Sequence, residues 1–82
     1  MTDIATLVRL ARVRDLVRSG AAKSIREAHS LTASDVARGV GVALPTVIRW
    51  EAGQRVPRGL PALKYGELLD ALLSGTNGNV RS

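Results

Sequence analysis

The sequence predicts an all-α fold, a compact domain of five helices, and three observations support it. Apolar residues recur three or four positions apart, capping residues and glycines mark the ends of short segments, and no stretch alternates between apolar and polar residues as a half-buried strand does. With 82 residues, 45% of them hydrophobic, the chain has room for one modest core. We expect a single domain over residues 1–73 and a flexible tail of small and polar residues over 74–82.

The first expected helix covers about residues 3–18, with Thr2 or Asp3 as its N-cap. Its apolar residues lie on two different arcs of the helical wheel. One arc contains Ile4, Leu7, Val8 and Ala11, and the other contains Leu10, Val13 and Val17. After a break at residues 19–20, a short second helix is expected over about 21–29.

Two short helices within residues 33–52 form the pattern that decides the interpretation. Val36 and Val40 lie four apart on the first of them, and Val47 and Trp50 lie three apart on the second. Each helix therefore turns one apolar edge toward the other. This arrangement is typical of a helix-turn-helix, which predicts sequence-specific binding to duplex DNA.

The ends of these two helices carry clear signals. Thr32 is the best N-cap in the sequence, so the third helix should cover about 33–39. Gly41 follows where the chain must reverse, a position that often needs positive φ. Pro45 fits the first turn of the fourth helix, expected over about 45–52, because that turn does not need its missing N–H.

A basic loop over 54–59 and a last helix over 60–73, with Pro61 in its first turn, complete the map. The last helix carries adjacent apolar ridges formed by Leu68, Leu69, Leu72 and Leu73. Surplus apolar surface of this kind usually marks a partner interface. We therefore expect a homodimer that uses the last helix, with the first helix as an accessory or rival contact.

A larger set of residues, within these two helices and around them, matches a known family. The set comprises Ile25-Arg26-Glu27-Ala28, Leu31 to Ala37, Gly41-Val42, Thr46 to Gly53, Pro57 and Tyr65 to Leu69. With these residues the chain resembles the Xre and lambda-repressor family over more than half its length, and the run from Val47 through Gly53 to Pro57 is the most specific part. The resemblance implies a lambda-repressor-like fold that binds a palindromic operator as a dimer. The extended N-terminal helix lies outside the minimal family domain.

The resemblance also implies roles for individual residues. Those expected at or near base edges are Ala33, Leu44, Pro45, Thr46 and Arg49. Those expected at phosphates are Thr32, Ala43, Arg55 and Arg58. An ion pair is expected between Arg26 and Glu51.

This chain departs from the family at the start of the recognition helix. Ala43 replaces the usual serine or threonine cap, and Leu44 and Pro45 replace polar residues that read bases. The two apolar side chains can touch thymine methyl groups but cannot form bidentate hydrogen bonds. Arg49 is thus the best candidate for a guanine contact, with Thr46 second.

Composition fits a DNA-binding protein. The net charge of +5 favours a polyanionic partner. The basic residues form no continuous block of the kind that addresses membranes, and the two aromatic residues, Trp50 and Tyr65, are too few for platforms that stack single-stranded bases. Double-stranded DNA remains as the expected partner, and no membrane interaction is expected.

The sequence lacks the residue patterns typical of enzymes and of metal-binding or cofactor-binding proteins. The chain has no cysteine and one histidine, His29, and its acidic residues form no catalytic or metal-binding spacing, so we expect neither an enzyme nor a cofactor or metal. Without a signal peptide or a long apolar span, the expected location is cytoplasmic, associated with the nucleoid.

The sequence therefore predicts a transcriptional regulator of phage or bacterial origin, more readily a repressor than an activator because no activation or effector domain fits into the chain. Two alternatives stay open. One is an antitoxin-type autorepressor that also binds a protein partner through the surplus apolar arcs. The other is a recombination directionality or architectural factor that bends DNA.

Overall fold

The structure is a computed structural model and describes residues 3–75 of the chain. Within this range the chain forms five helices and no strand. They are α1 (Ile4–Arg18), α2 (Ala21–Ala28), α3 (Ala33–Val40), α4 (Leu44–Glu51) and α5 (Gly59–Ser74). The predicted all-α, five-helix fold is confirmed, and each helix end lies within one residue of its predicted position. Most of the predicted tail, residues 76–82, lies outside the described residues.

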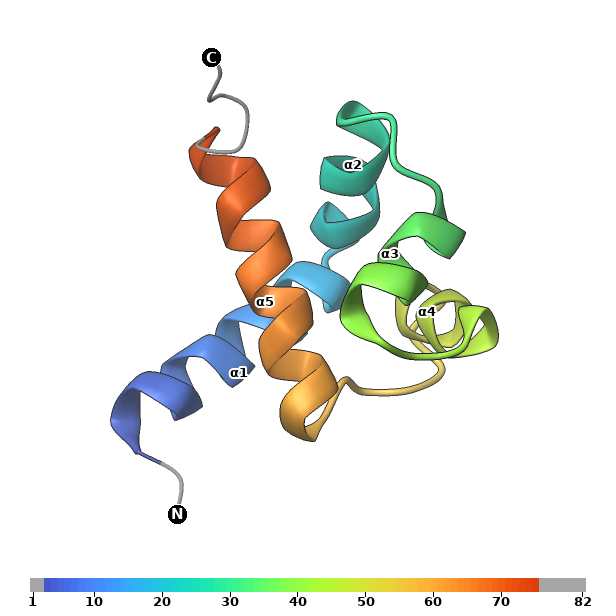
Figure 1. Cartoon of the computed structure of the whole chain (residues 1–82). Helices are drawn as coiled ribbons and strands as arrows, with labels where there is room; N and C mark the ends of the chain where they lie inside the picture. Colours follow the sequence, from blue (N-terminus) through green and yellow to red (C-terminus); the bar gives the residue numbers. More distant parts are fainter. Residues whose placement is uncertain (1–2, 76–82) are drawn as a thin grey trace.

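The two longest helices, α1 and α5, cross and pack against each other, and α1 passes behind α5 to reach the shorter helices, where it contacts α2 and α4 (Figure 1). The crossing of α1 and α5 is close. Val13 of α1 is fully buried, and Gly66 of α5 faces it so tightly that a Cβ added at Gly66 would lie 2.5 Å from the Val13 Cγ2 atom. Residue 66 therefore sets how near the two helices approach.

A single core draws side chains from all five helices. Its members are Val13, Val17, Ala22, Val36, Ala37, Val40, Val47, Trp50, Tyr65 and Leu69. Because α3, α4 and α5 share this core, the helix-turn-helix is rigidly attached to the rest of the domain.

The two apolar arcs of α1 differ in burial. Val13 and Val17 enter the core, whereas Ile4, Leu7 and Val8 remain exposed by 78%, 55% and 61%. Only the second arc is therefore internal, and the first is surface.

The apolar ridges of α5 also divide, and this corrects the predicted dimer contact. Leu69 and Leu72 are buried within the protomer, with 1% and 6% of their surface exposed, so they are core residues and not available to a second copy. Leu68 is half-buried and packs against the core, and Leu73 is 49% exposed. The α5 surface available for a partner is thus much smaller than the sequence suggests.

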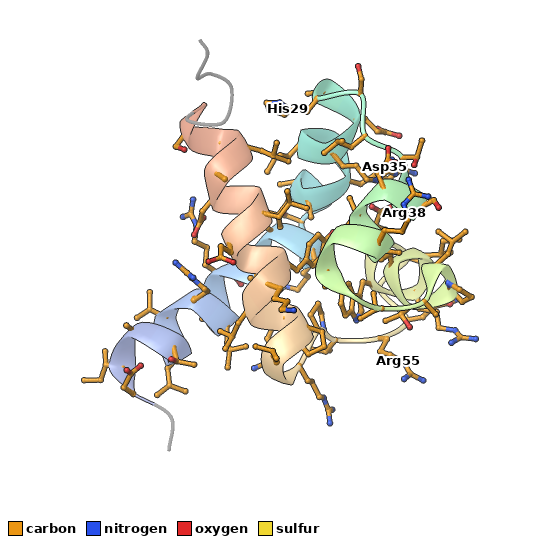
Figure 2. The ribbon with its side chains drawn as sticks, in the orientation of Figure 1. His29, Asp35, Arg38 and Arg55 are labelled. Atoms are coloured by element: carbon orange, nitrogen blue, oxygen red, sulfur yellow. The ribbon has the colours of Figure 1, made fainter. Side chains whose placement is uncertain are left out.

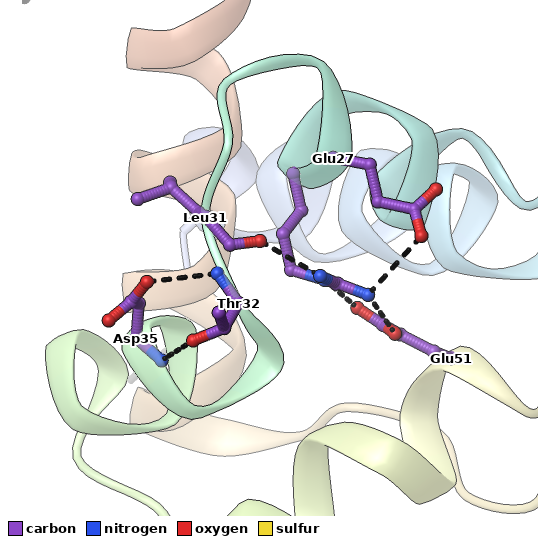
Figure 3. A network of polar contacts seen from close by, with 6 residues as sticks. Glu27, Leu31, Thr32, Asp35 and Glu51 are labelled. Carbon is purple, nitrogen blue, oxygen red and sulfur yellow. Dashed lines mark hydrogen bonds and ion pairs between the residues drawn. The ribbon is translucent and has the colours of Figure 1, made fainter.

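Side chains cap the first turns of α1 and α3. Asp3 Oδ1 accepts a hydrogen bond of 2.8 Å from the Thr6 amide, which identifies Asp3 as the cap of α1. In α3, Thr32 Oγ1 accepts from the Asp35 amide and Asp35 Oδ2 accepts from the Thr32 amide, both at 2.9 Å (Figure 3). This reciprocal capping box fixes the start of α3. No helix among the described residues has the length and apolar content needed to cross a bilayer.

Candidate nucleic-acid interface

The turn between α3 and α4 holds the two helices in a defined orientation. Gly41 adopts φ +88°, and the amides of Gly41 and Val42 both donate to the Ala37 carbonyl, at 2.8 and 3.0 Å. Val47 and Trp50 of α4 point into the core, with 0% and 3% exposure. The inward face of α4 is therefore fixed, and its opposite face must point outward.

The outward face of α4 carries mostly apolar side chains. Leu44 and Ile48, one helical turn apart, are 40% and 51% exposed, and Pro45 and Arg49 beside them are also exposed. Three of these four residues are among those expected to read bases. Ile48 is not, although its position one turn after Leu44 and next to the buried Val47 would have identified it.

Arg49 is the only charged residue on this outward face, and no ion pair to any residue in 3–75 holds it. Its guanidinium is therefore free to donate to a ligand. Ala43, the N-cap of α4, makes no side-chain capping bond because its side chain is a methyl group. Any contact from Ala43 to a phosphate must then use the backbone N–H.

A groove of about 550 Å³ separates α4 from the start of α5. It is lined by Thr46 and Trp50 on one side and by Arg55, Arg58 and Pro61 on the other. Thr46 is half-buried, whereas Arg55 and Arg58 are exposed. The Arg55 side chain extends away from the loop in Figure 2. Thr46 therefore faces the basic loop, and it lies next to Arg49 on α4, which follows three residues later.

The start of α3 contributes two more of the expected contact residues. Thr32 is exposed, and its hydroxyl oxygen is occupied as an acceptor by the Asp35 amide, so the hydroxyl hydrogen remains available to donate. Ala33 is half-buried and packs against the core, which leaves little of it for a base. The first turn of α3 can thus offer the Thr32 hydroxyl more readily than the Ala33 methyl group.

The charge next to this turn is partly neutralised. Arg38 Nη2 lies 2.7 Å from Asp35 Oδ1, and both side chains point to solvent beside α3 (Figure 2). The Thr32 amide, which donates to the Asp35 carboxylate, lowers the pKa of that carboxyl group, and Arg38 lowers it further. Asp35 is therefore ionised at neutral pH, and Arg38 contributes less net charge than Arg49 or Arg55.

The ion pair between Arg26 and Glu51 is present and has bidentate geometry. Arg26 Nε lies 2.7 Å from Glu51 Oε2, and Nη2 lies 3.0 Å from Oε1 (Figure 3). A third bond of 2.9 Å runs from Arg26 Nη1 to the Leu31 carbonyl. The side chains are only 11% and 9% exposed, and the hydrogen bond to Glu51 raises the pKa of Arg26. The pair ties α2 and the α2–α3 loop to the end of α4.

His29 is exposed at the end of α2 (Figure 2). Among the described residues, no three His, Asp or Glu side chains come together in a group that could hold a metal ion.

Comparison with known proteins assigns the fold to a family. Residues 23–72, more than half of the chain, match the family model described as Helix-turn-helix, of the Xre and lambda-repressor type. No curated protein and no solved structure matched the chain. The matched segment begins within α2 and ends within α5, so it contains α3, the turn, α4 and the basic loop. The chain belongs to the helix-turn-helix family of the Xre and lambda-repressor type and is a DNA-binding transcriptional regulator.

Proposed function

We propose that this regulator is a repressor that binds its operator as a homodimer, with α4 of each copy lying in the major groove. The observation that carries the proposal is the division of α4 into two faces. Val47 and Trp50 anchor the inner face, and Leu44, Ile48 and Arg49 project from the outer one. A helix that is packed against the core on one face and exposed on the other can enter the major groove of DNA, which is about as wide as a helix.

Base reading in this proposal depends on few polar groups. Arg49 donates to the O6 and N7 atoms of guanine, and Leu44, Pro45 and Ile48 contact thymine methyl groups. A single charged side chain per copy that contacts bases gives moderate discrimination between DNA sequences. Specificity therefore also depends on backbone contacts, groove shape and the spacing of the two half-sites.

Phosphates are bound around the edge of α4. Arg55 and Arg58 supply charge, and the Ala43 backbone and the Thr32 hydroxyl supply donors. Thr46 belongs in this group as well, because it faces the groove that holds the two arginines. Thr46 also stays a candidate for base reading, because it is the neighbour of Arg49 on the surface of α4.

The homodimer would bury the apolar surface that the protomer leaves exposed. The largest exposed apolar residues outside α4 and its loop are Ile4, Leu7 and Val8 on α1, with Leu60 and Leu73 on α5. With Leu69 and Leu72 inside the protomer, α1 becomes the principal candidate and α5 contributes Leu73. Sedimentation at micromolar concentration with operator DNA tests this: a mass of one protomer per duplex would contradict it.

The location follows from the partner. A repressor of phage or bacterial origin acts on the chromosome, and we propose that the protein works in the cytoplasm at the nucleoid. The antitoxin-type and architectural alternatives share the same DNA contacts. The antitoxin-type alternative would in addition form a stable complex with a partner protein. The architectural alternative would in addition bend the duplex strongly.

The test is selection of bound duplexes from a random library at a fixed salt concentration, followed by binding of the selected duplex to variants. A palindrome is expected. Arg49→Ala should lower affinity for the selected duplex by about tenfold and relax the preference at one position in each half-site. Arg9→Ala, which removes the same charge from an exposed position on α1, is the control. If Arg49→Ala keeps the preference of the parent protein, the role of α4 is wrong.

Variants of the basic loop should behave differently. Arg55→Ala or Arg58→Ala is expected to weaken all duplexes alike and to reduce the slope of log affinity against log salt by about one. A change in sequence preference in either variant would contradict the assignment of these arginines to phosphates.

A further inference from the structure

A second cleft, of about 260 Å³, lies on the α1 side of the loop that follows α4. The floor of this cleft is apolar and is formed by Val17 of α1 and by Val56 and Pro57 of the loop. Val17 and Pro57 are buried, whereas Val56 is 50% exposed. The cleft is separate from the groove beside Thr46, although the loop borders both.

Three arginines surround this floor, namely Arg14 and Arg18 from α1 and Arg55 from the loop. Arg14 is half-buried, and its Nε donates to the Pro57 carbonyl at 3.2 Å, which holds the side chain in place. Its two terminal nitrogens make no hydrogen bond to any residue in 3–75. Arg18 pairs with Asp15, and Arg55 has no ion pair within residues 3–75. No acidic side chain lines the described cleft, and although Asp15 offsets the charge of Arg18, Arg14 and Arg55 leave the cleft positive.

We propose that this cleft binds an acidic peptide segment of a partner protein, in which carboxylates flank an apolar side chain. Guanidinium groups match carboxylates in geometry and charge, and the apolar floor offers burial to a side chain such as leucine. A DNA phosphate would satisfy the arginines but would leave the floor without a partner. The proposal adds a protein-binding site to the DNA-binding function and does not depend on it.

The experiment is an NMR titration of the ¹⁵N-labelled full chain with the peptide acetyl-Glu-Leu-Glu-amide. Saturable shifts are expected at the amides of Val17, Gly53 and Val56. Acetyl-Gln-Leu-Gln-amide lacks the charges, acetyl-Glu-Gly-Glu-amide lacks the apolar side chain, and inorganic phosphate lacks both the apolar group and the peptide. Each of these three probes should bind about tenfold more weakly, the factor expected for loss of a charged hydrogen bond or of a buried leucine side chain.

Variants locate the site. Arg14→Gln with Arg18→Gln should weaken binding of acetyl-Glu-Leu-Glu-amide by about tenfold or more. The control, Arg9→Gln with Lys23→Gln, removes the same charge from other exposed positions and should bind as the parent does. The two double variants should bind duplex DNA equally, because Arg55, the arginine that this cleft shares with the proposed phosphate contacts, is unchanged in both. If the double variant is poorly folded, the single variant Arg18→Gln replaces it. This variant is expected to weaken binding of the peptide.

Several results would overturn the proposal. One is a set of shifts that does not saturate, and another is equal binding of the glutamate and glutamine peptides. Phosphate binding as strong as peptide binding would make the cleft a simple anion site. Protection of Val17 by duplex DNA would make the cleft part of the DNA interface, whereas Val56 lies between the two arginines assigned to phosphates and does not distinguish the two cases.

Discussion

The ring of Tyr65 stacks on the ring of Trp50, with centroids 5.1 Å apart and planes inclined by 19°. The contact joins α5 to the buried face of α4, and the two residues are 0% and 3% exposed. The Tyr65 hydroxyl is buried as well, yet it has no hydrogen-bond partner among residues 3–75. The ring therefore stabilises the position of α4, whereas its hydroxyl group carries a desolvation cost.

Replacing Tyr65 by phenylalanine should raise the free energy of unfolding by about 1 kcal/mol, because the ring stays and the unpaired hydroxyl is removed. Urea denaturation at neutral pH measures the change. Tyr65→Leu is the control: it keeps an apolar residue but loses the stacked ring, and it should destabilise the domain. A phenylalanine variant less stable than the parent would mean that the hydroxyl has a favourable contact.

The same residue makes stability depend on alkaline pH. Burial raises the pKa of Tyr65 to about 12, and the negative charge of Glu51 adds to the effect. The unfolded chain loses this proton near pH 10, so above that pH the unfolded state binds fewer protons than the folded state. Stability should then fall by roughly 1.4 kcal/mol per pH unit until about pH 12.

The measurement compares the parent with Tyr65→Phe at about pH 9 and about pH 11, since the variant lacks this group and should lose less stability than the parent. Tyr65 is the only tyrosine, so its phenolate absorbance can be followed directly. Equal losses in the two proteins would contradict the raised pKa.

Much of this arrangement can be predicted from the sequence because it depends on local spacing. Val36, Val40, Val47 and Trp50 occupy the core positions that helical periodicity assigns to them, and helix ends follow capping residues and glycines closely. The pairing of Arg26 with Glu51 required the family resemblance, since nothing local relates residues so far apart in sequence.

Other features depend on tertiary contacts and could not be predicted. Which arc of α1 is buried is decided by the small surface that Gly66 offers on α5. The burial of Leu69 and Leu72, unlike Leu73, depends on how α5 is rotated against its neighbours. Thr46 faces the basic loop because that loop folds back beside α4.

The backbone after α2 contains one position of strain. Ser30 has φ +59° and is the only residue other than glycine with positive φ among those described. Ser30→Gly should raise the free energy of unfolding by about 0.5–1 kcal/mol, because glycine adopts this conformation without a Cβ clash. Ser19→Gly is the control: Ser19 has φ −79°, so glycine there should not stabilise the domain. Thermal denaturation of both variants decides the point, and a gain at residue 19 alone would contradict it.

The buried pair of Arg26 and Glu51 should be strongly coupled. Removing either partner, by Arg26→Met or Glu51→Leu, leaves the other charge in a largely buried site without its bidentate partner and should cost about 3 kcal/mol of stability. The double variant should recover most of that loss because no charge remains to be desolvated. A double-mutant cycle by urea denaturation gives the coupling energy, and additive effects of the two changes would mean that the groups do not depend on each other.

Two helical glycines offer a matched test of the packing of α1 on α5. At Gly66 a Cβ would meet Val13 Cγ2 at 2.5 Å and Arg9 Cγ at 3.1 Å, whereas at Gly39 of α3 nothing lies within 4 Å. Gly39→Ala should stabilise the domain by about 1 kcal/mol through helix propensity. Gly66→Ala gains the same propensity but overpacks a site whose β-branched neighbour cannot rotate freely, so it should destabilise by about 1–2 kcal/mol.

The partner change Val13→Ala separates the steric effect from a general loss of stability. Alone it should destabilise, because it removes fully buried methyl groups. Combined with Gly66→Ala it should cost less than the sum of the two single changes, since each relieves the crowding or the void that the other creates. Free energies of unfolding for the four proteins test this. Strict additivity would show that α1 is free to move away from α5, and that Gly66 does not set their separation.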